Sequence, residues 1–316
     1  MPNIFPSGVS NIEKANILKY FQDQRKNAIS DDEDPSLPSV FVMNLDEDDL
    51  HIFNSFHTNV VTLRLKDTLL SVRLDTQWRE VTTNRSRPFI TVETFFTPSS
   101  NNKRSAKRRR SFAEESIISS RLVNLFSEKT HTIFPSSISV TDGQTRYIPH
   151  FHISISLIAD GGDVFEAAVC AVNFISLVHT ISSPINAAET FYLSGDDSNR
   201  NLTGNQTSLA AVAAKFPFAM TVCTKFVDGG YVNVILPSQI ASELADCKTV
   251  LLLSNEGVID VTKYGGMEYD FKLMSDMVKE AEQVRLRLAN DITKAAYERL
   301  TLIRDENINR NTRQTK

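Results

Sequence analysis

The part of the sequence that most constrains the fold runs from an alternating strand, through a glycine-rich corner, into a helix without a wide polar face. Isoleucine or leucine alternates with serine over residues 153–157, and the corner is Asp160-Gly-Gly-Asp163. The next segment, VFEAAVCAVNFISLVHT, has helical spacing and apolar side chains on most faces. Because such a helix needs neighbouring elements to cover it, we expect a strand that turns directly into a buried helix. The corner between them is either a functional site or only a turn.

Composition is typical of a soluble globular protein. The chain has 316 residues, of which 41% are hydrophobic and 23% charged, enough for one large domain or two smaller ones. No apolar run reaches the roughly 18 residues of a membrane span, and residues 1–10 lack the features of a signal peptide. We therefore expect no membrane association and a cytosolic or nuclear location. Cys170, Cys223 and Cys247 are widely spaced, which favours reduced core residues over disulfides or a zinc site.

Periodicity predicts a first block of strands and helices after an N-terminal helix. Residues 11–27 have helical spacing, with Ser10 and Glu13 as a capping box, and an acidic, proline-containing linker follows. Strands are expected in VFVMNL, in NVVTLRLKDTLLSVRL with a hairpin corner at Lys66-Asp67-Thr68, and in PFITVETFF. A helix is expected near residues 112–126, followed by a hairpin that turns at Asp142-Gly143.

A second block follows a polar connector. Strands are predicted in FPFAMTVCTKFV, YVNVILP, TVLLLSN and GVIDVTKYGG, with a helix at SQIASELADC. One continuous helical pattern then runs from Tyr269 to about Arg304, and its distal part is expected to leave the domain. The fold class is therefore α+β, with two related strand–helix halves and a long C-terminal helix. The predicted parts are an N-terminal helix and linker (1–38), a first half (39–184), a connector (185–215), a second half (216–284) and a helical tail (285–316).

Several separated segments, in the same order, resemble the RNase PH family. They are RPFITVETFFTP, SFAEESIISSRLVNLF, SISLIADGGDVFEAAVCAVNFISL, FPFAMTV and LSNEGVIDVTKYGG. The resemblance covers about residues 41–284 and implies an RNase PH-like fold. With its long helical tail, the chain most resembles the tailed ring subunits of the eukaryotic RNA exosome, the polymyositis/scleroderma autoantigen type. Two other exosome ring subunits of the family remain alternatives.

The resemblance implies a place in a ring of six RNase PH-like subunits. Such a ring carries RNA-binding cap subunits, threads single-stranded RNA through its channel and passes it to hydrolytic 3′–5′ exoribonucleases. The eukaryotic ring is generally not catalytic. The resemblance thus implies a structural role in RNA processing and degradation, including that of rRNA, in the nucleus, nucleolus and cytoplasm, without a cofactor.

The family's chemistry depends on residues that this chain does not match. Active members are phosphorolytic, and a Thr-Arg pair after the glycine corner holds the phosphate at the start of the helix. This chain has Asp163-Val164-Phe165 there, and we expect Asp163 to cap its own helix. The catalytic Asp of the second half has no match, because NQTSLAAVAAKFPFAMTV holds no carboxylate. Asp196 and Asp197, in the connector, are interpreted as a solvated turn.

No catalytic residue is therefore assigned, and two enzymatic alternatives remain. The first is an active phosphate-dependent 3′–5′ exoribonuclease that contributes half of a composite site in a dimer. The second is a small-molecule enzyme such as a kinase, which we rank last because the chain lacks a phosphate-binding glycine loop.

Positive charge is concentrated in one segment before the second helix. Lys103, Arg104, Lys107, Arg108, Arg109 and Arg110 lie within eight residues, and without them 28 basic residues remain against 38 acidic ones. We assign these six residues, together with Arg87 of the RPFITVE segment, to RNA binding. A nuclear-localisation signal or a solvated loop explains the basic segment equally well.

Two further patterns are interpreted as structural. His150 and His152 point to one face of a strand at metal-ligand spacing, but no third ligand is evident, so no metal is assigned. Asp142-Gly-Gln-Thr-Arg146 is similar to the phosphate motif, yet it lies in a hairpin turn that no helix follows.

Overall fold

The fold is described from a computed structural model. It describes residues 11–28, 39–43, 45–53, 59–81, 89–96, 112–126, 140–142, 145–182, 190–192, 217–266 and 268–314. The helices are α1 (Asn11–Ala28), the short 3₁₀ helix η1 (Glu47–Asp49), α2 (Phe112–Phe126), α3 (Val164–Val178), α5 (Gln239–Leu244) and α6 (Phe271–Gln314). The strands are β1 (Ser39–Met43), β2 (Leu50–Phe53), β3 (Val60–Leu65), β4 (Thr68–Val81), β5 (Phe89–Phe96), β6 (Val140–Asp142), β7 (Thr145–Ala159), β8 (Thr180–Ser182), β9 (Thr190–Tyr192), β10 (Phe218–Val227), β11 (Gly230–Ile235), β12 (Cys247–Ser254) and β13 (Gly257–Gly265). Among these helices, none is both long and apolar enough to cross a membrane.

The first half of the chain forms a six-stranded sheet, called here sheet B. Its strand order is β2-β3-β4-β7-β5, and β6 pairs with the other end of β7. The predicted hairpin corner is confirmed, since β3 and β4 pair with Leu65 opposite Thr68, and Lys66 between them has a left-handed φ of 52°. Along residues 153–157 of β7 the apolar side chains are buried and the serines are half-buried. Sheet B therefore turns one face to the core and leaves the other face more open.

The second half forms a five-stranded sheet, called here sheet A, with the order β1-β11-β10-β12-β13. The predicted strands of this half are present as β10, β11, β12 and β13, and Ser238 caps α5 by accepting a hydrogen bond from the Ala241 N–H. Sheet A also contains β1, which pairs in parallel with β11 although the sequence analysis grouped it with the first half. The sheets are therefore not built from two consecutive blocks of the chain.

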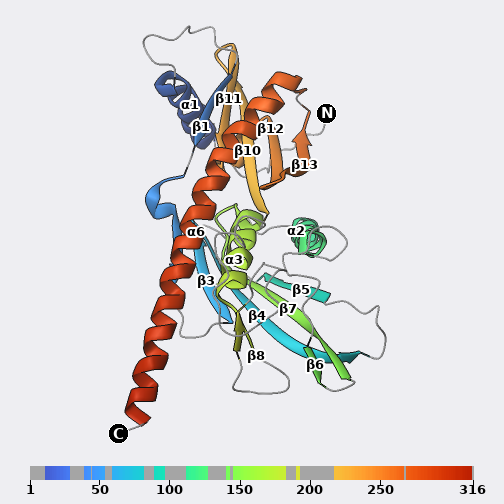
Figure 1. The fold of residues 1–316 in the computed structure, drawn as a ribbon. Helices are drawn as coiled ribbons and strands as arrows, with labels where there is room; N and C mark the ends of the chain where they lie inside the picture. The colour runs from blue at the N-terminus through green and yellow to red at the C-terminus, as the bar shows by residue number, and fades with distance from the viewer. Residues whose placement is uncertain are drawn as a thin grey trace.

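The helices pack between and along the two sheets. Figure 1 shows α2 and α3 between sheet A and sheet B, and α6 running past α3 and β3 toward the C-terminus. All 15 residues of α3 are buried, as its apolar pattern predicts. The α3 helix is thus the centre of the molecule and contacts both sheets.

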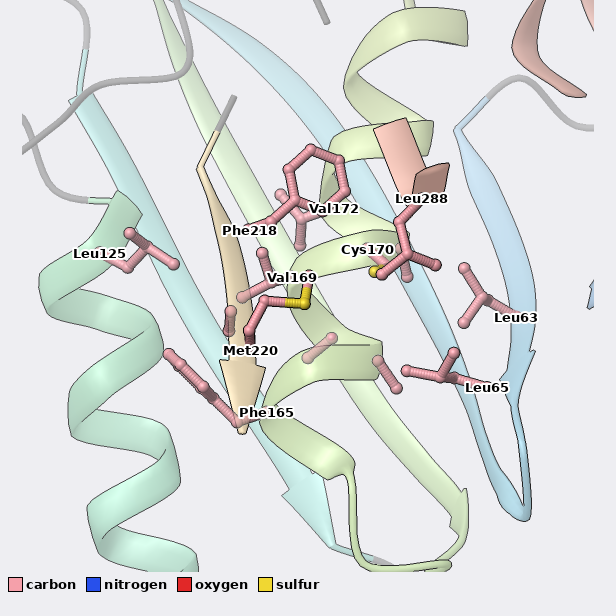
Figure 2. Packing of buried hydrophobic residues seen from close by; sticks show 14 of the residues in the cluster. Leu63, Leu65, Leu125, Phe165, Val169, Cys170, Val172, Phe218, Met220 and Leu288 are labelled. Carbon is pink, nitrogen blue, oxygen red and sulfur yellow. The ribbon is translucent and has the colours of Figure 1, made fainter. Parts of the chain in front are cut away.

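One large apolar cluster fills the space around α3. Figure 2 shows side chains of β3, α2, α3, β10 and α6 meeting there, among them Leu63, Leu125, Val169, Met220 and Leu288. The three cysteines are free and buried, as predicted. Burial raises the pKa of the Cys170 and Cys223 thiols to about 12, so both stay protonated and behave as small apolar residues.

The C-terminal helix is longer than its sequence pattern predicts. It spans 44 residues and ends at Gln314, past the predicted end near Arg304. Leu288, Ile292 and Ala296 are fully buried in the same cluster as α3, although they follow residue 285, where the sequence analysis began the tail. The helix therefore ties sheet A to the layer that covers sheet B.

A buried histidine lies at the end of α3. His179 is 4% exposed, its Nε2 lies 2.8 Å from Thr76 Oγ1, and no described residue gives its Nδ1 a hydrogen-bond partner. Burial lowers the pKa of His179 from 6.5 to about 4, against the opposing effect of Asp75. The folded chain therefore keeps this imidazole neutral at mildly acidic pH.

Stability should consequently fall as the pH drops from 6.5 to about 4. Above this window His179 is neutral in both states, and within it the unfolded chain binds a proton that the folded chain does not. The loss amounts to about 3 kcal/mol when the pH reaches 4. Urea unfolding at a series of pH values measures it, and His179→Gln, which keeps a polar group beside Thr76, should lack this component. An equally steep loss in the variant would contradict the assignment to His179.

Candidate functional site: the corner before α3

The corner between β7 and α3 is held by hydrogen bonds within the chain. The Gly161 N–H donates to Thr68 Oγ1 at 3.0 Å, and the Gly162 N–H donates to Asp160 Oδ1 at 2.9 Å. A Cβ on Gly161 would lie 2.5 Å from the carbonyl carbon of Asp67, and Gly162 has a φ of 107°. Both glycines are thus required by geometry, one by close packing and one by its backbone conformation. Their N–H groups already have acceptors.

Asp163 does not cap α3 in the way that the sequence analysis expected. It occupies the N-cap position, and its carbonyl oxygen accepts the Ala167 N–H at 2.9 Å, but its side chain accepts no capping hydrogen bond. The reason is its backbone conformation, φ −99° and ψ 45°, which is not the extended conformation that directs an N-cap side chain to the free N–H groups. The carboxyl group is instead buried, and its charge acts on Lys66.

Lys66, at the β3–β4 corner, is the cation of this buried site. Burial lowers the pKa of Lys66, while the carboxylates of Asp163, Asp49, Glu166 and Asp46 oppose that effect. Its Nζ donates to the carbonyl oxygen of Leu236, the residue directly after β11. Lys66 therefore links the first-half hairpin to the second half of the chain.

Glu166 completes the site from the first turn of α3. It is almost fully buried, and its Oε1 accepts a hydrogen bond from the Thr221 hydroxyl on β10. Lys66, Asp163 and Glu166, called here the seam cluster, thus gather at the start of α3, between the two halves. Within the cluster, Lys66 is the cation and Asp163 and Glu166 are the anions.

Sequence reasoning missed Lys66 and Glu166 as members of this site. The sequence analysis placed Lys66 only in a turn, and Glu166 lies in a helix whose other side chains are mostly apolar. Glu166 itself could have indicated the site from the sequence, because a carboxylate in a buried helix needs a partner.

The residues assigned to RNA binding are not part of the described site. Arg87 and the basic residues Lys103, Arg104, Lys107, Arg108, Arg109 and Arg110 lie outside the described residues, as do Asp196 and Asp197. The basic segment follows the end of β5 at Phe96 and precedes α2 at Phe112, so its two attachment points are at the edge of sheet B and at α2. The RNA-binding assignment stays a prediction.

The two patterns interpreted as structural both lie on β7. The Asp142 to Arg146 segment joins the paired strands β6 and β7, and a strand follows it, as predicted. His150 and His152 both approach the hydroxyl of Thr91 on β5, at 3.0 and 2.8 Å. Among the described residues, no group of three or more potential ligands has the geometry of a metal site.

Comparison with known proteins gives a match at the level of three-dimensional structure. No protein-family model and no curated protein sequence matches this chain. The Archaeoglobus fulgidus exosome with RNA bound to the active site contains a chain that superimposes with a TM-score of 0.54 at 14% identity, covering 88% of this chain and 99% of its own. A chain of an archaeal exosome core gives the same TM-score and identity, covering 91% and 99%.

The chain has the RNase PH-like fold. The match covers 88% and 91% of this chain and 99% of the archaeal chains, so the predicted α+β fold class is confirmed. At this level of identity the likeness concerns the fold, and the chemistry has to be argued from the residues of this chain.

Proposed function

We propose that this chain is a non-catalytic, RNase PH-like structural subunit of an RNA exosome core ring. In this role it supports 3′–5′ RNA processing and degradation by helping to thread single-stranded RNA to associated hydrolytic ribonucleases. The observation that carries the proposal is the seam cluster at the start of α3, together with the archaeal exosome fold.

The start of a helix attracts anions because its free N–H groups and its dipole are positive there. In active members of the family this is where a Thr-Arg pair holds phosphate. Here Asp163 and Glu166 are buried at that position, and their charges already act on Lys66. A phosphate ion brought to this place would meet two carboxylates, and like charges about 4 Å apart repel by several kcal/mol in a partly buried site. The corner therefore favours a structural role over phosphorolysis.

The position in the ring, the partners, the RNA contacts and the cellular location follow the resemblance found in the sequence. We assign the chain to the tailed, polymyositis/scleroderma autoantigen-type position, with other RNase PH-like subunits as neighbours and RNA-binding cap subunits above the ring. The basic segment between β5 and α2, with Arg87, would guide the RNA by contacting its phosphates. The corresponding location is the nucleus, nucleolus and cytoplasm.

A phosphorolysis assay separates this proposal from its enzymatic alternative. The chain, assembled with its partner subunits, is given inorganic phosphate and an RNA oligonucleotide, and nucleoside diphosphate release is measured. We expect Asp163→Asn to leave any release unchanged, as should Arg64→Ala, which removes an exposed arginine of β3. Release that is abolished by Asp163→Asn, but not by Arg64→Ala, in intact complexes would establish the composite-site exoribonuclease instead.

Purification of the native protein tests its partners. Mass spectrometry of what remains bound at moderate salt should find several other RNase PH-like chains, RNA-binding caps and a hydrolytic ribonuclease. A lone protein or a homo-oligomer would contradict the proposed place in a mixed ring.

A further inference from the structure

A chain of four polar side chains crosses the open face of sheet B, away from the seam cluster. His150 Nε2 lies 3.0 Å from Thr91 Oγ1, and the same oxygen lies 2.8 Å from His152 Nδ1. On its other side, His152 Nε2 lies 3.6 Å from Glu93 Oε2. The order in space is therefore His150, Thr91, His152, Glu93, called here the histidine relay.

Register explains why these residues meet. Thr91 of β5 pairs in parallel with His152 of β7. His150 lies two residues before His152 on β7, and Glu93 lies two residues after Thr91 on β5, so both are on the same face of the sheet as this pair. His152 and Glu93 have side chains that are 28% and 56% exposed, whereas His150 is buried. One end of the relay thus exchanges protons with solvent, and the other end is shielded.

The single hydroxyl of Thr91 determines where the protons lie when both imidazoles are neutral. A hydroxyl donates one hydrogen bond, so one of the two ring nitrogens near Thr91 accepts from it and the other donates to it. If Thr91 donates to His152 Nδ1, the proton of His152 lies on Nε2, facing the Glu93 carboxylate. His150 then donates from Nε2 to the Thr91 oxygen. This arrangement satisfies all three contacts, and in it both rings carry their proton on Nε2.

Uptake of one proton by His152 reverses the arrangement. The imidazolium has an N–H at both nitrogens, so His152 Nδ1 donates to the Thr91 oxygen and Nε2 still faces Glu93. The Thr91 hydroxyl then donates to His150 Nε2, which has to be the acceptor. The proton of His150 therefore moves from Nε2 to Nδ1.

We propose that His150, Thr91, His152 and Glu93 form a proton-responsive relay, in which protonation of His152 switches the tautomer of His150 through the Thr91 hydroxyl. The switch adds one positive charge to the open face of sheet B, at His152 on β7. The neighbouring strand of β7 is β5, and the basic segment follows β5 in the chain. It is independent of the proposed role in a ring.

Several charged groups lie around the relay. Glu93 faces His152 from β5, and Asp75 of β4 is paired opposite it, although Arg73 lies 2.6 Å from that carboxylate. Burial, the charge of Arg79 on β4 and a charged His152 all lower the pKa of His150. His150 thus stays neutral and changes only the position of its proton.

Nitrogen NMR of ¹⁵N-histidine in the full chain tests the relay, because protonated and unprotonated ring nitrogens have well separated shifts. Above the His152 transition we expect both rings to be protonated on Nε2. Below it, His152 should carry both protons and the His150 proton should lie on Nδ1, with the two changes sharing one midpoint. A His150 tautomer that stays the same across the His152 transition would overturn the proposal.

Two substitutions at Thr91 separate coupling through the hydroxyl from a direct charge effect. Thr91→Val keeps the shape but removes the hydroxyl, so the His150 tautomer should no longer follow His152. Thr91→Ser retains the hydroxyl and should retain the coupling. Coupling that persists in Thr91→Val would show that the hydroxyl does not carry it and would overturn the relay.

Discussion

Leu288→Ala should lower the free energy of unfolding by about 3–5 kcal/mol, the cost of a large cavity in a packed core. Leu288 is fully buried and lies in the cluster that surrounds α3 (Figure 2). Leu286→Ala is the matched control, because Leu286 is on the same helix but 48% exposed. It should change the free energy of unfolding by less than ~0.5 kcal/mol.

Urea unfolding of the unsubstituted chain and the two variants measures this difference. The slope of the unfolding free energy against urea concentration should be compared among the three proteins. The two variants have the same change in composition and in helix propensity, so only burial distinguishes them. Equal, small effects would mean that the helix leaves the core before Leu288, as the sequence-based boundary at residue 285 implies. A large effect confined to Leu288 would make α6 part of the core that joins the two sheets.

The behaviour of α6 illustrates which parts of the fold the sequence predicts. Spacing of apolar residues identifies the helix and the side that is buried, because Leu288, Ile292 and Ala296 share one stripe. Spacing does not identify what that stripe packs against, since α3 lies more than a hundred residues earlier in the chain. The same limit applies to β1, whose parallel partner β11 is in the other half.

The candidate site shows the same division between local and distant information. The glycine corner and the lack of a Thr-Arg pair are local and could be read from the sequence. The prediction that the Asp163 side chain caps α3 was wrong, because the backbone conformation of the corner depends on Gly161 packing against the β3–β4 hairpin. Lys66 and Thr221 meet α3 only through tertiary packing, so no spacing rule could place them there.

Lys66→Met should lower the free energy of unfolding by about 3–5 kcal/mol, the loss typical of removing one partner from a buried group of charges. Methionine has a similar length and no β-branch, so the left-handed backbone at residue 66 is no harder for it to adopt. The substitution leaves the buried carboxyl groups of Asp163 and Glu166 without their cation. Lys279→Met, at an exposed lysine paired with Asp276, should cost at most ~1 kcal/mol.

A double variant shows whether the loss comes from the seam cluster itself. If Asp163 is the charge left uncompensated, Asp163→Asn added to Lys66→Met should restore part of the lost stability, although Asp163→Asn alone should destabilise the chain. Additive effects of the two substitutions would mean that Lys66 acts through its contact with Leu236 alone. Coupled effects would identify the seam cluster as the electrostatic contact that holds the two halves together at the start of α3.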